Sequence, residues 1–222
     1  MCGIIAYIGN QEVVPLLIGG LKKLEYRGYD SAGVCLVIDH GLKTVKEKGK
    51  VVKLEKSLVK QKLSSTIGIA HTRWATHGEP NQINSHPHLD CSSKIAIAHN
   101  GIVENYHALK ELLESEGHKI VSDTDSEIIA HLVEKFYQGD LEQAVTKALE
   151  LIVGSYGLVV MHQDEEKIIA ARKSSPLIIG VGDGEMFIAS DVPAILKHTK
   201  QVIYLQDEEI AIINKDEYSI KN

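Results

Sequence analysis

The sequence lacks a long hydrophobic run and an excess of basic residues. No apolar stretch approaches the roughly 18 residues that a transmembrane helix needs, and the N-terminus lacks a basic start and soon reaches the polar 10–12. The net charge of -6 argues against a general nucleic-acid surface, because phosphate contacts need clustered Lys and Arg. We therefore expect neither a membrane nor a nucleic acid as partner.

Cysteine is scarce as well. The chain has Cys2, Cys35 and Cys91, an odd number without the paired spacing of a metal site. Such usage is typical of a reduced, cytosolic (cytoplasmic) protein with buried thiols. Cys35 fits that interpretation because it lies in the apolar run 34–38, whereas Cys91 lies in a polar stretch and has no evident role.

Internal repeats, low-complexity segments, obvious linkers and regular βαβ alternation are also missing. With 44% apolar and 24% charged residues, the 222 residues are expected to form one compact domain, 1–222. Strands at both ends with helices between them predict an α+β fold of antiparallel sheets covered by helices. The expected strands are 2–8, 32–38, 42–48, 66–73, 94–99, 156–162, 167–172, 177–181, 186–189, 202–205 and 209–213, and the expected helices are 12–25, 104–116, 125–138, 141–153 and a short one near 192–198.

Local signals refine these elements. Pro15 lies in the first turn of its helix, where a missing N–H does no harm. Thr124 and Glu127 have the spacing of a capping box. The glycines of 180–184 resemble a nucleotide loop only superficially, since no Gly-Lys-Ser/Thr follows and strands flank them, so a hairpin turn is favoured.

Cys2 offers chemistry that an internal cysteine lacks. If Met1 is cleaved, Cys2 carries a thiol and an α-amine within a few ångströms of each other. The reference pKa of an α-amine is about 7.7–8.0, so it can act as a neutral base near physiological pH. A nucleophile activated by its own terminal amine is a known arrangement for acyl transfer. On its own this signal is weak, and a packed thiol is the alternative.

His99-Asn100-Gly101 follows a predicted strand and precedes a predicted helix. The Asn100 side-chain amide and the Gly101 backbone N–H could together hold the oxyanion of a tetrahedral intermediate. Asn-Gly is also a favoured turn pair, and spacing alone favours that turn.

Further candidates each have a structural alternative. Arg73 could bind a carboxylate with its guanidinium or form a surface ion pair, and Trp74 could cover a small substrate or pack in the core. Asp125 could accept an ammonium group or favour the start of a helix. Arg27 could support the site or satisfy the last carbonyls of the preceding helix.

The eleven histidines raise the question of a metal. His86-Pro87-His88 is the densest group, with His71 and His77 nearby in sequence. Pro87 prevents a helical histidine pair, and neither HExxH nor CxxC occurs. We therefore expect no metal site.

Taken together, the motifs resemble the class II glutamine amidotransferases, which have the N-terminal nucleophile hydrolase fold. Each motif alone is weak, but they follow the family's order over most of the chain, and their tyrosine- and tryptophan-containing blocks resemble the sugar-phosphate branch of the family. The motifs are residues 2–5, 24–33, 68–78, 84–88, 99–106, 122–127 and 175–180.

The resemblance implies a four-layer αββα sandwich and a set of roles. Cys2 would attack the side-chain amide of L-glutamine with its α-amine shuttling protons, and Asn100 and Gly101 would form the oxyanion hole. Arg73 and Asp125 would hold the α-carboxylate and α-ammonium of the substrate. Trp74, Thr76 and His77 would belong to a loop that closes over it, and Arg27 would support the site. No metal or organic cofactor is implied.

The resemblance also implies a larger context. The family's complete enzymes continue into a sugar-phosphate isomerase domain that receives the ammonia, so we expect this chain to be an excised glutaminase domain, monomeric alone and homodimeric at full length. It would release ammonia without making the amino sugar, and a form retaining Met1 would be inactive. The alternatives are a glutaminase domain serving another acceptor, such as a phosphoribosyl compound, and a non-catalytic glutamine-binding module.

Overall fold

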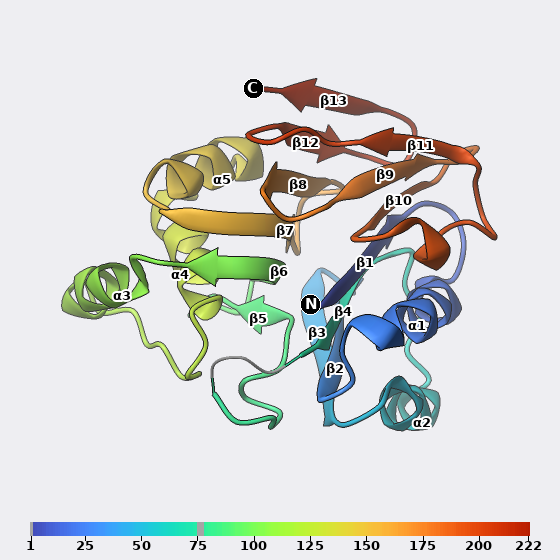
Figure 1. Ribbon diagram of the computed structural model, residues 1–222, viewed down its shortest axis with the longest axis horizontal. Coiled ribbons are helices and arrows are strands. Elements are labelled where there is room, and N and C mark those ends of the chain that lie inside the picture. Colours follow the sequence, from blue (N-terminus) through green and yellow to red (C-terminus); the bar gives the residue numbers. More distant parts are fainter. Residues whose placement is uncertain (1, 75–77) are drawn as a thin grey trace.

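Two antiparallel sheets form the centre of the computed structural model, which describes residues 2–74 and 78–222 (Figure 1). The first sheet has the order β11-β9-β10-β1-β4-β2-β3 and the second β13-β12-β8-β7-β6-β5. Their bounds are β1 Gly3–Ile8, β2 Ser31–Ile38, β3 Gly41–Lys48, β4 Ile67–Arg73, β5 His88–Leu89, β6 Ile95–Val103, β7 Gly154–His162, β8 Ile168–Lys173, β9 Ile178–Val181, β10 Met186–Ala189, β11 Gln201–Tyr204, β12 Ile210–Ile213 and β13 Tyr218–Lys221.

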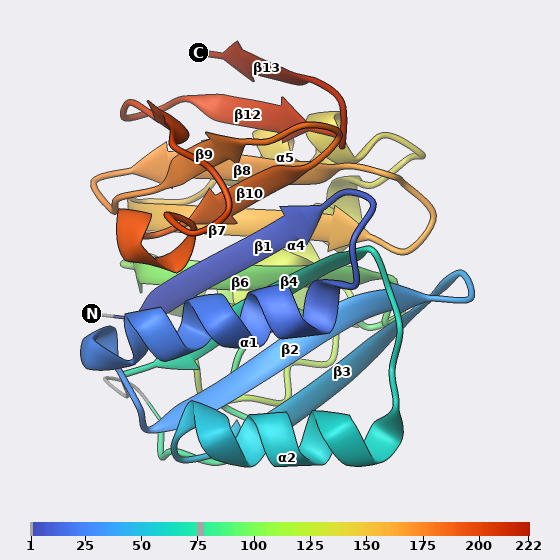
Figure 2. The same cartoon turned by 90° about the vertical axis from the view of Figure 1, so that its right-hand side faces the viewer.

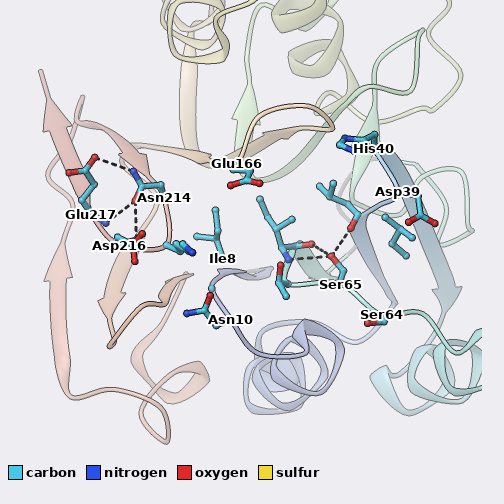
Figure 3. A pocket seen from close by; sticks show the side chains of 16 residues that line it. Ile8, Asn10, Asp39, His40, Ser64, Ser65, Glu166, Asn214, Asp216 and Glu217 are labelled. Atoms are coloured by element: carbon cyan, nitrogen blue, oxygen red, sulfur yellow. Dashed lines mark hydrogen bonds between the residues drawn. The ribbon is translucent and has the colours of Figure 1, made fainter.

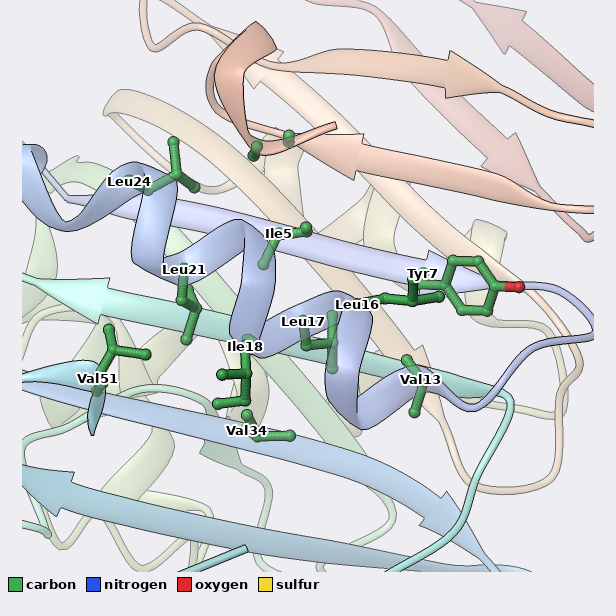
Figure 4. Packing of buried hydrophobic residues seen from close by; sticks show 14 of the residues in the cluster. Ile5, Tyr7, Val13, Leu16, Leu17, Ile18, Leu21, Leu24, Val34 and Val51 are labelled. Atoms are coloured by element: carbon green, nitrogen blue, oxygen red, sulfur yellow. The ribbon is translucent and has the colours of Figure 1, made fainter. Parts of the chain in front are cut away.

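The residues of β1 alternate between two cores because successive side chains of a strand point to opposite faces. Ile4 and Ala6 pack between the two sheets, against residues of the second sheet such as Val159. Ile5 and Tyr7 point the other way and pack against helix α1 (Figure 4). Since both faces of β1 are covered, all six of its residues are buried.

Helices cover the outer face of each sheet. The helices α1 (Val13–Leu24) and α2 (Val51–Gln61) lie on the first sheet (Figure 2). The second sheet carries α3 (Tyr106–Ser115), α4 (Glu127–Phe136) and α5 (Leu141–Glu150). The predicted α+β, four-layer αββα sandwich is therefore confirmed.

The position of β1 determines where the N-terminal cysteine lies. Strand β1 pairs with β4 on one side, opposing Gly3 to Thr72, and with β10 on the other, opposing Ile5 to Ala189. Cys2 immediately precedes this central strand. It is thus held at one end of the sandwich, close to the last residues of β4.

Two sequence predictions are wrong in their local detail. Asn100 and Gly101 do not form a turn, because β6 continues to Val103 and pairs with β7 along this whole length. No capping box forms at Thr124 and Glu127: the carboxylate of Glu127, the first residue of α4, accepts backbone N–H bonds from Val121 at 3.0 Å and Ser122 at 2.6 Å.

Other differences concern elements that the sequence reading omitted or overestimated. Helix α2 was not predicted, nor were β5 and β13. The helix expected near 192–198 is only a 3₁₀ turn at Val192–Ala194. None of the described helices is both long and apolar enough to cross a membrane.

Helix α2 offers a matched test of its packing. Val51 is fully buried against the first sheet, whereas Val59 on the same helix is 71% exposed. We expect Val51→Ala to lower the free energy of unfolding by about 2 kcal/mol, because two buried methyl groups are lost and a cavity remains. Val59→Ala should change it by less than about 0.5 kcal/mol. Urea unfolding measures both, and equal losses would contradict this placement of α2.

Candidate functional site

Hydrogen bonds hold both the sulfur and the carbonyl oxygen of Cys2, the first described residue. Its Sγ accepts the backbone N–H of Trp74 at 3.3 Å. Its carbonyl oxygen accepts two side-chain donors, Arg27 Nε at 2.9 Å and Asn100 Nδ2 at 3.1 Å. Because Trp74 follows β4 and Asn100 lies on β6, both sheets contribute to holding this residue.

Asn100 is itself oriented by a buried histidine. His71 Nε2 lies 3.0 Å from Asn100 Oδ1, which can only accept, so the imidazole donates this bond. The bond directs the amide nitrogen of Asn100 toward Cys2. Burial lowers the pKa of His71 to about 3. The imidazole is therefore neutral at physiological pH and acts as a fixed donor.

Gly101 occupies a position that no other residue fits. Its φ of +146° lies in the region that L residues rarely adopt. A Cβ there would lie 2.0 Å from the carbonyl oxygen of Ser155 on β7. The glycine thus allows β6 and β7 to approach closely beside Cys2.

The sequence-predicted residues Cys2, Arg73, Trp74, Gly101 and Asp125 border one small hollow of about 30 Å³. Arg73 is 5% exposed, and burial lowers the pKa of its guanidinium, which the nearby charges of Cys2 and Asp125 partly offset. The Oδ2 atom of Asp125 accepts the backbone N–H of Val103 at 2.8 Å. A cation and a carboxylate beside one thiol suit a zwitterionic amino acid.

Of the remaining candidates, one is half exposed, one supports Cys2 from beside the hollow, and two are not described. Trp74 is not a core residue, because it is 47% exposed, and its ring contacts Tyr29 edge-on at a centroid distance of 6.1 Å. Besides binding Cys2, Arg27 forms an ion pair with Asp191 at 3.1 Å, which places its guanidinium in support of the site. Thr76 and His77 lie outside the described residues.

Burial raises the pKa of the Cys2 thiol, although the Trp74 N–H, Arg73 and Arg27 oppose the rise. A base must therefore remove its proton. The two histidines that border the hollow are poor candidates, because burial lowers the pKa of both. Three of their four ring nitrogens also have hydrogen-bond partners: His86 Nδ1 accepts the N–H of His99, and His99 contacts Ser126 Oγ at 2.8 Å and the Ser155 carbonyl at 3.3 Å.

Sequence reasoning did not identify four residues that border the hollow. They are His86, His99, Thr124 and Ser126. His86 was weighed only as a metal ligand, but its ring stacks on His71 at 4.1 Å instead. For Thr124 and Ser126 the sequence did offer a signal: both flank Asp125, a candidate in its own right, just before a predicted helix.

A much larger hollow lies elsewhere in the described structure. It measures about 890 Å³ and is bordered by Ile8, at the other end of β1 from Cys2 (Figure 3). Its polar groups belong to turns, and Ser65 Oγ is already bonded to the Val37 carbonyl at 2.7 Å. We find no cysteine among its described residues, so the chemistry concentrates in the smaller hollow.

Comparison with known proteins agrees with this geometry. A family model described as a glutamine amidotransferase domain matches residues 71–197. The chain belongs to this family. Glutamine–fructose-6-phosphate aminotransferases (isomerizing) from Clostridium tetani and Chlorobaculum tepidum are 51% and 52% identical to it, over 97% and 100% of this chain but 36% and 37% of their own lengths. The chain thus spans little more than a third of the curated relatives it matches.

A solved structure supports the same assignment of the fold. A glutamine phosphoribosylpyrophosphate amidotransferase from B. subtilis superposes with a TM-score of 0.86 and 25% identity, over 99% of this chain and 49% of that one. The family resemblance inferred from the motifs, including the N-terminal nucleophile hydrolase fold, is therefore confirmed for this glutamine amidotransferase domain.

The close approach at Gly101 can be tested against a second glycine. Gly139 also has a positive φ, +91°, but a Cβ atom added there would meet no other atom within 4 Å. We expect Gly139→Ala to lower the free energy of unfolding by about 1–2 kcal/mol through backbone strain alone. Gly101→Ala should lower it by clearly more, because the methyl group meets the Ser155 carbonyl. Denaturant unfolding compares them, and equal losses would refute the packing argument.

Proposed function

We propose that this domain hydrolyses L-glutamine to L-glutamate and ammonia through a thioester on Cys2. The observation that carries the proposal is the convergence of Cys2, Arg73, Gly101 and Asp125 at one hollow, with Asn100 bonded to the Cys2 carbonyl beside it. Sγ attacks the side-chain amide carbon, ammonia leaves, and water releases glutamate from the thioester. Retention of the nucleophile favours an enzyme over a glutamine-binding module, which would not need it.

The α-amine of Cys2, freed by removal of Met1, is the base in this proposal. The pKa of the thiol is raised by burial, so the thiolate does not form unaided. The histidines nearby are already engaged. An α-amine has a reference pKa near 7.7–8.0 and accepts the proton at physiological pH, directly or through a water.

Substrate binding follows from the charges around the thiol. Arg73 pairs with the α-carboxylate of glutamine, and Asp125 accepts its α-ammonium group. The side-chain amide of Asn100 and the backbone N–H of Gly101 stabilise the oxyanion. A hollow of about 30 Å³ holds little more than a water molecule. Glutamine therefore needs Trp74 to move outward from the hollow.

In the full-length protein, we propose that the ammonia passes to fructose 6-phosphate to give glucosamine 6-phosphate. Relatives at 51–52% identity are named glutamine–fructose-6-phosphate aminotransferases, whereas the phosphoribosylpyrophosphate amidotransferase is only 25% identical. This difference favours a sugar-phosphate acceptor over a phosphoribosyl compound. The acceptor would bind to an isomerase domain of the same chain, working in the cytoplasm.

Glutamine hydrolysis by protein of verified N-terminal mass tests the nucleophile and its base. We expect Cys2→Ala to abolish turnover and a form retaining Met1 to be equally inactive, because its nitrogen is an amide. Cys35→Ala, which removes a buried thiol away from the hollow, should keep turnover. An electrophilic glutamine analogue should label Cys2 irreversibly. Full activity with Met1 retained would refute the role of the amine, and reversible binding of the analogue would indicate a sensor.

Asn100→Ala tests the oxyanion donor. We expect kcat to fall about 10²- to 10³-fold, equivalent to roughly 3 kcal/mol of barrier, because one donor to the developing charge is lost. Asn10→Ala, an exposed asparagine beyond the far end of β1, is the matched control and should leave kcat unchanged. Steady-state ammonia release measures both, and an unchanged kcat in Asn100→Ala would remove that side chain from the mechanism.

A further inference from the structure

Four potential metal ligands meet on the outer side of the second sheet, away from Cys2. Cys91 follows β5, His118 follows α3, and His131 and Glu134 lie one turn apart on α4. One ligand atom from each lies within 4.8 Å of every other. Although these residues are distant in sequence, α4 packs against both β5 and α3 (Figure 1).

Three of four separations within this cluster lie close to the edges of a metal-centred tetrahedron, and the fourth, between His118 and Glu134, is a hydrogen bond that a metal ion would replace. Cys91 Sγ lies 3.7 Å from His118 Nδ1 and 3.4 Å from His131 Nδ1. Glu134 Oε2 lies 2.9 Å from His118 Nδ1 and 3.5 Å from His131 Nδ1. Zn²⁺ bonds of about 2.0–2.3 Å to sulfur, nitrogen and oxygen in tetrahedral geometry separate ligand atoms by roughly 3.3–3.6 Å.

The surroundings of His131 favour a cation at the centre. This ring is 1% exposed and lies between two carboxylates: its Nε2 is 3.4 Å from Glu127 Oε1, and its Nδ1 is 3.5 Å from Glu134 Oε2. A neutral imidazole carries a single N–H. If Nε2–H donates to Glu127, the Nδ1 lone pair faces Glu134 Oε2 and the Cys91 sulfur. These three atoms can all donate electron pairs, and a divalent cation between them would bind all three.

Other groups hold the ligands in the orientation that metal binding requires. Glu127 would fix the tautomer of His131, as carboxylates commonly do for metal-bound histidines. The backbone N–H of Lys119 donates to Cys91 Sγ at 3.3 Å, which suits a thiolate. The backbone N–H groups of Cys91 and Ser92 each donate to the carboxylate of Glu134 at 3.2 Å.

The cluster is also open to solvent on one side. Cys91 is exposed, and an open hollow of about 210 Å³ is bordered by Cys91, His118 and Glu134 together with Glu116. A hydrated cation can therefore reach the ligands without unfolding of α4.

We propose that Cys91, His118, His131 and Glu134 bind one Zn²⁺ ion in a structural site. Thiolate and imidazole ligands suit zinc, and four protein ligands leave no position open for catalysis. The ion would fasten the turn after β5 and the segment after α3 to α4. Asp125 and Ser126 border the glutamine hollow and immediately precede α4. By fixing α4, the metal ion would also stabilise the position of these two residues. The earlier expectation that Cys91 has no role would then be wrong.

Cobalt titration of the reduced, metal-free chain tests this proposal. We expect one Co²⁺ per chain, with the intense visible bands of a tetrahedral ion and a thiolate-to-cobalt charge-transfer band, and displacement of both by Zn²⁺. Cys91→Ser should abolish the charge-transfer band and weaken binding at least about tenfold. His118→Asn should weaken binding similarly but keep the thiolate band, which guards against a variant that merely misfolds.

Matched controls come from residues of the same type outside the cluster. Cys2→Ser and His107→Asn should leave the cobalt spectrum and stoichiometry unchanged. A wild-type chain without a thiolate band, or equal behaviour of Cys91→Ser and Cys2→Ser, would overturn the proposal and leave only a hydrogen-bonded cluster. The spectrum needs no glutamine turnover, so this test is independent of the proposed glutaminase activity.

Discussion

The hydrogen bond from Asn100 to the carbonyl of Cys2 connects the two sheets at the site. Asn100 belongs to β6 in the second sheet, while Cys2 immediately precedes β1 in the first. Most of the packing between the sheets is apolar, and apolar contacts are not directional. This polar bond, together with the one from Arg27, sets the position of the Cys2 backbone relative to Asn100 and Gly101. The geometry of the hollow depends on this relative position.

A layer of neutral histidines supports this bond. His71, His86 and His99 are all buried, and burial lowers the pKa of each. A charged ring at these positions would be costly without a partner. Neutral rings instead supply directional donors and acceptors, as His71 does for Asn100. Histidines that suggest a metal in the sequence thus serve as hydrogen-bonding scaffold between the sheets.

The sequence was informative wherever a pattern was local. The apolar, strand-like composition of 2–8 predicted β1. The resemblance of ordered motifs predicted the sandwich and five of the residues that border the hollow. The interpretation of Asn100-Gly101 as a turn failed because pairing with β7 outweighs local turn preference. Helix α2 was missed although Val51, Leu54 and Leu58 follow a helical spacing, since its many lysines obscured the apolar face.

The cluster around Cys91 shows what a single sequence cannot reveal. Its ligands come from three segments, and only His131 and Glu134 have a spacing that could be recognised along the chain. Their convergence depends on how α4 packs against β5 and α3. Tertiary packing of this kind leaves no short-range signal, whereas motifs such as His99-Asn100-Gly101 remain contiguous.

The backbone N–H bonded to the Cys2 sulfur belongs to the only tryptophan of the chain. Because that indole is half exposed and contacts Tyr29, its surroundings change with any rearrangement at the mouth of the hollow. Indole fluorescence of the unlabelled protein therefore originates from this one location, once excitation is chosen to avoid the tyrosines. The fold thus supplies its own optical reporter beside the reactive sulfur.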